Sequence, residues 1–114
     1  MTYFKSVDDS TGFSPEKLFK ADLFSSPNLF VGLNCFERGQ SQKIHLHSES
    51  DKFYLILSGK ARMMVGGETR EVGRGMLVWA PADVPHGVAE ALESTVMLVV
   101  MAPPPGGISP RAAL

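Results

Sequence analysis

Short apolar runs, separated by glycine and proline, dominate the chain. The runs recur about every ten residues, and several alternate apolar with polar positions. Alternation with a period of two is typical of strands that bury one face, and regular punctuation by turn residues favours a sandwich or barrel. The pattern therefore predicts an all-β domain with strands near Leu29–Glu37, Ser41–His47, Lys52–Leu57, Ala61–Val65, Glu68–Val72, Met76–Trp79, Gly87–Glu90 and Ser94–Met101.

The turns and the two ends of the chain are less regular. The sequence from Val65 to Glu68 contains a Gly-Gly pair, which predicts a tight hairpin because glycine accepts the positive φ angles of such turns. One short helical turn is expected over Ser14–Lys20, since Ser14 can cap it and Pro15 suits its first position. These signals divide the chain into an N-terminal segment (1–28), a barrel (29–102) and an extended Pro/Gly-rich C-terminal tail (103–114).

The histidines are the clearest chemical signal. The chain has three, and all of them lie in two short segments: His45 and His47 are separated by one residue, and His86 follows about forty residues later. Side chains at i and i+2 of a strand point to the same face, so His45 and His47 should face the same way. A third imidazole from a neighbouring strand would complete a set of nitrogen donors that suits a transition metal.

The face opposite these histidines carries apolar residues. If the histidine face lines a barrel interior, Ile44 and Leu46 point outward, as do Phe53 or Leu55 on the next strand. Outward apolar residues on adjacent strands need cover. A second copy of the chain would provide it and make a homodimer. The alternative is that the N-terminal segment, with Phe13, Leu18, Phe19, Leu23 and Phe24, lies over them.

Composition narrows the class of protein. With 114 residues, 44% of them hydrophobic, the chain can form one domain with a substantial core. Its net charge of −1 comes from scattered charges of both signs, which argues against nucleic-acid binding. The single cysteine fits a reducing compartment, and the apolar run from Val96 to Ala102 is too short to span a membrane. We therefore expect a cytoplasmic protein that binds neither nucleic acid nor membrane.

Two spaced motifs resemble those of the cupin family. The first family motif has glycine, five residues, His-x-His, three or four residues, glutamate, six residues and glycine; Gly39, His45, His47 and Gly59 match it. The second has glycine, five residues, Pro-x-Gly, two residues, histidine, three residues and asparagine. Here Gly75, Pro81 and His86 match, whereas Asp83 and Glu90 replace the usual glycine and asparagine. The resemblance covers roughly residues 31–100, and two motifs with three histidines make it specific.

The resemblance implies a double-stranded β-helix, which is a small jelly-roll barrel, that is usually dimeric and holds a metal at its mouth. It also exposes a departure, because Lys52 stands at the position of the family's glutamate ligand. A charged ammonium has no lone pair for a metal. Asp51 could replace the glutamate if the preceding turn is one residue tighter. Three alternatives follow. The metal is held by the three histidines alone, or it is held by the three histidines and Asp51. In the third, Lys52 has displaced the metal and the pocket binds an anionic ligand.

Two classes of function remain open. The first is a metal-dependent enzyme, a dioxygenase or another oxygenase, or an isomerase, that acts on a small molecule through a divalent iron, manganese, nickel or zinc ion held by His45, His47 and His86. Lys52 and Asp51 are then the candidates for a catalytic role. The second is a non-catalytic barrel that binds or senses a small molecule, with or without a metal, because Lys52 replaces the glutamate.

Overall fold

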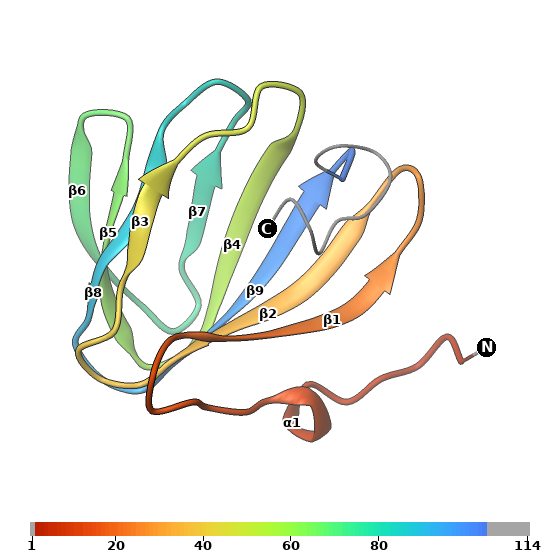
Figure 1. Cartoon of the computed structure of the whole chain (residues 1–114), viewed down its shortest axis with the longest axis horizontal. Coiled ribbons are helices and arrows are strands. Elements are labelled where there is room, and N and C mark those ends of the chain that lie inside the picture. The colour runs from red at the N-terminus through yellow and green to blue at the C-terminus, as the bar shows by residue number, and fades with distance from the viewer. Residues whose placement is uncertain (1, 105–114) are drawn as a thin grey trace.

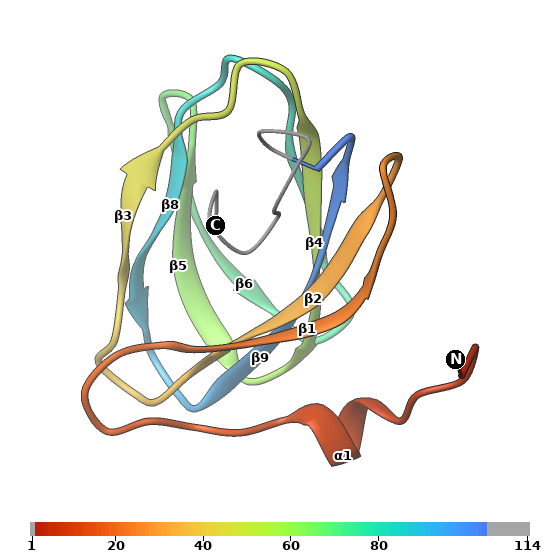
Figure 2. The ribbon, with the colours of Figure 1, turned by 45° about the vertical axis from the view of Figure 1, so that its right-hand side comes forward.

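Nine β-strands and one short helix form the regular structure of residues 2–104, the part of the chain that this computed structural model describes. The strands make two antiparallel sheets that face one another (Figures 1 and 2). The five-stranded sheet has the order β1-β2-β9-β4-β7, and the four-stranded sheet has the order β3-β8-β5-β6. The elements are α1 (Val7–Ser10), β1 (Phe19–Ser25), β2 (Phe30–Phe36), β3 (Gln42–His45), β4 (Asp51–Ser58), β5 (Lys60–Val65), β6 (Glu68–Gly73), β7 (Leu77–Ala80), β8 (His86–Ala91) and β9 (Thr95–Ala102).

The core lies between the two sheets, as the alternating pattern predicts. In β4, Tyr54 and Ile56 are buried in the barrel, whereas Phe53 and Leu55 point to the outer face and are half-buried. The two curved sheets thus enclose a double-stranded β-helix, and the prediction of an all-β barrel is confirmed. The core consists of Phe30, Phe36, Tyr54, Ile56, Ala61, Met63, Val72, Ala80, Val88, Ala91, Met97, Val99 and Met101.

The structure contains one strand more than the sequence pattern predicts. The additional strand is β1, which pairs antiparallel with β2 at one edge of the five-stranded sheet. Phe19, Ala21 and Leu23 alternate along β1 and pack on the outer face of this sheet against Leu33 and Cys35. The apolar positions of β1 are too few to distinguish a strand from a loop, and pairing with β2 is what settles the matter.

The predicted position of the helical turn is wrong. The helix is α1, over Val7–Ser10, whereas residues 14–18 are irregular and Phe19 already begins β1. The cap signal at Ser14 is overridden by tertiary contacts, since the Gln40 side-chain amide donates to the Ser14 carbonyl at 2.7 Å. Val7 packs against the outer cluster of the five-stranded sheet, and Figure 2 shows the N-terminal segment running along that side of the molecule.

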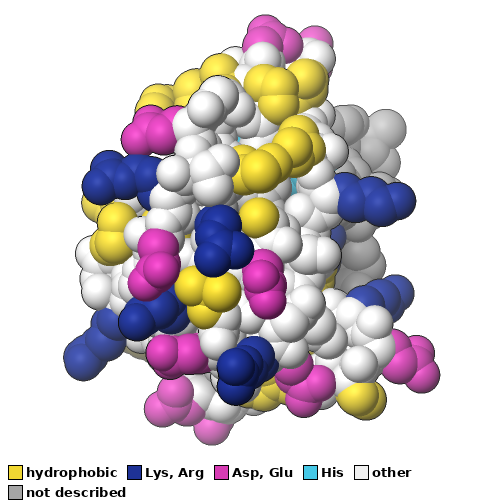
Figure 3. Space-filling view, turned by 90° about the vertical axis from the view of Figure 1, so that its left-hand side faces the viewer, with side chains coloured by type: hydrophobic (Ala, Val, Ile, Leu, Met, Phe, Trp, Pro, Cys, Tyr) yellow, Lys and Arg dark blue, Asp and Glu magenta, His cyan; other side chains and the backbone are white. Residues whose placement is uncertain are grey.

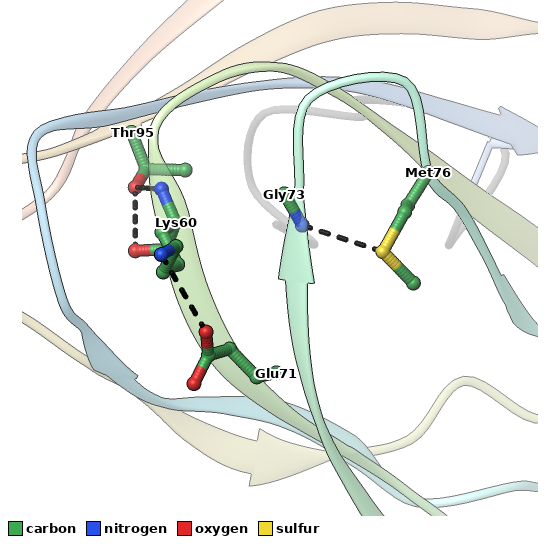
Figure 4. A network of polar contacts seen from close by, with 5 residues as sticks. All are labelled: Lys60, Glu71, Gly73, Met76 and Thr95. Atoms are coloured by element: carbon green, nitrogen blue, oxygen red, sulfur yellow. Dashed lines mark hydrogen bonds and ion pairs between the residues drawn. The ribbon is translucent and has the colours of Figure 1, made fainter.

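Two glycines shape turns that position the strands. Gly66 (φ +60°) lies in the hairpin between β5 and β6, which confirms the predicted turn. Gly59 (φ +87°) joins β4 to β5, and a Cβ there would collide with the Ser94 carbonyl oxygen. The Thr95 hydroxyl accepts from the Lys60 amide and donates to the carbonyl oxygen of Lys60, each at 3.1 Å (Figure 4). This network joins β5 to β9 at the end of the barrel where β4 finishes.

The outer surface combines charges of both signs with apolar side chains. On the face in Figure 3, acidic and basic side chains are interspersed, and exposed ion pairs such as Arg62–Glu90 (3.5 Å) and Lys60–Glu71 (3.7 Å) join neighbouring strands. Ile44 and Leu46 are 54% and 47% exposed, so the N-terminal segment does not bury them. Within the described residues, no helix is long and apolar enough to cross a membrane. Most of the predicted tail, from residue 105 on, lies outside those residues.

Candidate metal centre

Three histidines, one on β3, one shortly after β3 and one on β8, meet inside the barrel. His45 ends β3 and His86 begins β8, and the two residues are direct partners in the antiparallel pair. Their ring centroids lie 4.4 Å apart. The ring of His47, which follows β3, lies 5.2 Å from that of His45 and 5.8 Å from that of His86. The expectation that a distant histidine joins the other two is therefore met by strand pairing.

Backbone carbonyls set the orientation of two of these rings. Nδ1 of His45 lies 2.8 Å from the Lys43 carbonyl oxygen, and Nδ1 of His86 lies 2.9 Å from that of Val84. A carbonyl oxygen only accepts hydrogen bonds, so each Nδ1 carries the proton. The lone pair of both rings is then on Nε2. Such outer hydrogen bonds are the usual way to fix the tautomer and the orientation of a metal-binding histidine.

The remaining ring nitrogens match the needs of a metal ligand. Nε2 of His47 and Nε2 of His86 are buried without a hydrogen-bond partner among the described residues. One nitrogen from each of the three histidines lies within 4.8 Å of the others. A buried polar atom without a partner costs roughly 1–3 kcal/mol, and a shared ion would satisfy both of these atoms. The three side chains are therefore positioned to hold a metal ion.

The site keeps its imidazoles neutral. Burial lowers the pKa of His47 to about 4, and the nearby charge of Lys52 adds to the effect. Burial likewise lowers the pKa of His86 to about 4, although the hydrogen bond to Val84 opposes it. The pKa of His45 is lowered by burial as well. The neutral form is the one that binds metal, so all three rings are ready to ligate at neutral pH.

Comparisons with known proteins assign the chain to a family. A family model described as "Cupin domain" (Cupin_2) matches residues 32–102. The chain belongs to the cupin family. It is 38% identical over 77 residues to the uncharacterized protein SCO3923 of Streptomyces coelicolor, a match that covers 68% of this chain and 72% of the relative.

Solved structures agree with this fold over most of the chain. The structure of TT1209 from Thermus thermophilus superposes with a TM-score of 0.84 at 37% identity, over 90% of this chain and 98% of the other. KdgF from a Halomonas species superposes with a TM-score of 0.82 at 21% identity, over 96% of this chain and all (100%) of the other. At that identity the second likeness concerns the fold alone.

Lys52, and not Asp51, faces the interior of this cupin. Lys52 is only 2% exposed, and its Nζ lies 4.8 Å from the centroid of the Tyr54 ring. Asp51 is exposed, and its Oδ1 accepts a hydrogen bond from the Ala82 amide at 3.0 Å. The regular alternation of β4 allows only one of two adjacent residues to point inward. The register that would bring Asp51 into the site is therefore not the one the chain adopts.

The environment of Lys52 disfavours its charge. Burial lowers its pKa to about 7, and the positive charge of Lys20 contributes further. Among the described residues no carboxylate forms an ion pair with Lys52. At neutral pH the side chain therefore exists both as an ammonium, which donates hydrogen bonds, and as a neutral amine, which accepts a proton.

Two residues near the histidines were not identified from the sequence as part of the site. Tyr54 is fully buried, its ring centroid lies 6.3 Å from that of His86, and its hydroxyl has no partner among the described residues. The shared face of Lys52 and Tyr54 on β4 was the available signal. Lys20 belongs to β1, and the short alternation of Phe19, Ala21 and Leu23 around it was the available signal for that strand.

A groove between the two edge strands β1 and β3 reaches His45. It has a volume of about 760 Å³ and is lined in part by Lys17, Lys20, Lys43 and His45. A second, smaller groove of about 320 Å³ lies beside β6 and β7 and contains none of the three histidines. The first groove therefore borders one of the three candidate ligands, His45, and its size suits a small molecule.

Proposed function

We propose that this cupin binds a divalent transition metal through His45, His47 and His86 and acts with it on a small molecule, as a dioxygenase or another oxygenase, or as an isomerase. The main support is the pair of buried Nε2 atoms, on His47 and His86, that have no partner among the described residues. Three neutral nitrogen donors in a closed group are a suitable set for iron, manganese, nickel or zinc. The groove beside His45 offers room for a substrate.

The chemistry would be divided between the metal and the protein. When bound, such an ion supplies Lewis-acid polarisation of a substrate oxygen or a binding position for dioxygen. Lys52 would hold or release a proton at a substrate atom, because its pKa of about 7 allows both forms. The Tyr54 hydroxyl would donate a hydrogen bond to a substrate oxygen. The apolar core below excludes water from the closed end of the barrel.

A second function is favoured by one observation. Lys52 occupies the inward position where the cupin motif has glutamate, and its positive charge would repel a dication. The alternative is accordingly a barrel without metal that binds or senses a small molecule and performs no reaction.

Metal analysis distinguishes the two functions. Protein purified without an affinity tag is analysed by elemental mass spectrometry, together with His86→Ala and with Asp51→Asn as the matched control on the exposed side of β4. We expect about one metal per chain in the parent and in Asp51→Asn, and a loss of at least tenfold in His86→Ala. A parent without stoichiometric metal, even after incubation with Fe²⁺, Mn²⁺, Ni²⁺ and Zn²⁺, would establish the metal-free alternative.

The assembly and the location stay predictions. We propose a homodimer, because Ile44 and Leu46 remain exposed on the outer face of the chain. The cytoplasm is the compartment that the single cysteine favours.

A further inference from the structure

The groove beside His45 has lining residues of one charge only. Lys17, Lys20 and Lys43 line it, and its remaining lining residues other than His45 are uncharged: Ser14, Leu18, Phe19, Ser41 and Gln42. Burial and the neighbouring charge of Lys17 lower the pKa of Lys20, and the exposed carboxylate of Asp22, which is not part of the lining, opposes this shift. The groove therefore presents more positive than negative charge to anything that enters. Concave surfaces of one charge attract ligands of the opposite charge.

The same polarity continues to the interior of the barrel. Lys52 is buried next to the histidines, and its charge lowers the pKa of His45, His47 and His86. Lys20 in turn lowers the pKa of Lys52, so the charges on β1 and β4 act on a common space. The groove reaches His45, and Lys52 is buried behind it on β4. No carboxylate of the described residues forms an ion pair with Lys52.

A buried ammonium without an anion is unfavourable, since removal from water is not offset by an opposite charge. A bound anion would supply that partner. The Tyr54 hydroxyl is buried and without a partner among the described residues, and Nζ of Lys52 lies over the ring that carries it, 4.8 Å from the ring centroid. An ammonium and a phenol that both lack an acceptor suit the two oxygens of a carboxylate. A carboxylate oxygen is in addition a ligand that first-row divalent metals accept.

We infer that the substrate or ligand of this cupin is a small organic acid, whose carboxylate binds Lys52 and Tyr54 beside the three histidines after entering past Lys17, Lys20 and Lys43. The inference rests on the proposed function in that it assigns a substrate class to the same site. This inference explains why lysine replaces the motif's glutamate. The side chain at this position would bind the carboxylate of the small molecule, whereas a glutamate there would bind the metal.

The test uses succinate as the probe and succinamide as its neutral analogue, with binding measured by titration calorimetry on the full chain with and without Zn²⁺. We expect succinate to bind at least tenfold more tightly than succinamide. The substitution Lys52→Met should weaken succinate binding at least tenfold while it leaves succinamide unchanged. Lys60→Gln is the matched control, because Lys60 is exposed on β5 and pairs with Glu71. It should bind succinate like the parent.

A second substitution tests the groove. Lys20→Gln should weaken succinate binding severalfold, so the test does not depend on a single buried position. Equal affinity for succinate and succinamide, or equal losses in Lys52→Met and Lys60→Gln, would overturn the inference. Inorganic phosphate binding more tightly than succinate would overturn the choice of a carboxylate.

The inference and the proposed function fail separately. If Zn²⁺ binds stoichiometrically but succinate shows no preference over succinamide, the metal centre stands and the ligand class is wrong. If succinate binds in the expected pattern and no metal binds, the ligand class stands and the metal-dependent function is wrong.

Discussion

Asp51 accepts a hydrogen bond from the backbone amide of Ala82 at 3.0 Å, and this contact holds the Asp51 side chain on the outside of the barrel. The adjacent residue of the same strand, Lys52, consequently points inward and is buried. One hydrogen bond between β4 and the loop after β7 thus accompanies the choice of register, and the register decides which charge lies near the histidines.

The first prediction follows from this register. Lys52→Glu should tighten Zn²⁺ binding at least tenfold, because an inward carboxylate replaces a cation beside the histidines. Asp51→Asn should change the affinity less than twofold, since the outward amide oxygen still accepts from Ala82. Competition with a chelator of known affinity measures both. The reverse pattern would mean that Asp51 reaches the site in solution, and no change in either variant would mean that the histidines act alone.

The second prediction concerns the pH dependence of stability. The pKa of Lys52 is lowered by burial from 10.5 to about 7 in the folded chain. Between these values the unfolded chain binds more protons, so stability should rise with pH across this window, by at most about 1 kcal/mol per pH unit. Below about pH 7 Lys52 is charged in both states, and the full cost of burying that charge lowers the stability of the folded chain. Urea unfolding of the parent and of Lys52→Met from pH 7 to pH 9.5 measures the free energy of unfolding, and we expect this rise to be absent in the variant. The same pH dependence of stability in both proteins would refute a buried Lys52.

The third prediction concerns the histidines of the metal-free chain. Burial lowers the pKa of His47 and His86 to about 4, below the usual 6.5. The unfolded chain therefore binds more protons between pH 4 and 6.5, and stability should fall as the pH drops through that range. Nuclear magnetic resonance titration of the imidazole protons measures the pKa of each histidine, and the signals are easy to assign because the chain has only three histidines. Midpoints near 6.5 for all three would show that the rings are exposed to water.

The fourth prediction separates steric collision from backbone strain at two glycines. Gly59 and Gly39 have nearly the same positive φ, +87° and +91°. A Cβ on Gly59 would strike the Ser94 backbone, whereas a Cβ on Gly39 meets nothing within 4 Å. Gly39→Ala should therefore cost about 1–2 kcal/mol, the strain alone. Gly59→Ala should cost more than about 3 kcal/mol or prevent folding. Denaturant unfolding compares them, and equal losses would contradict the collision.

The fifth prediction concerns assembly. Light scattering at micromolar concentration should give twice the chain mass of 12.4 kDa. Replacing Ile44 and Leu46 together by serine should give a monomer, because these exposed apolar side chains would form the contact. Leu77 and Trp79, exposed at 68% and 57% on β7, provide the control pair. If the control pair dissociates the dimer and the first pair does not, the contact lies on the five-stranded sheet instead.

Local patterns in the sequence determined most of the barrel. Alternation along β4 and the Gly-Gly turn after β5 are properties of adjacent residues, and both were readable without a structure. The same holds for the shared face of His45 and His47, which follows from the period of a strand. The spacing of the histidines indicated that the two segments belong to one site.

Only the tertiary structure decided the rest, because the deciding interactions join residues far apart in the chain. The strand β1 exists through its pairing with β2, and it places Lys20 near the site. The inward position of Lys52 is associated with the contact between Asp51 and Ala82, which are separated by thirty-one positions. The burial that holds the histidines neutral likewise arises only when the two sheets close around them.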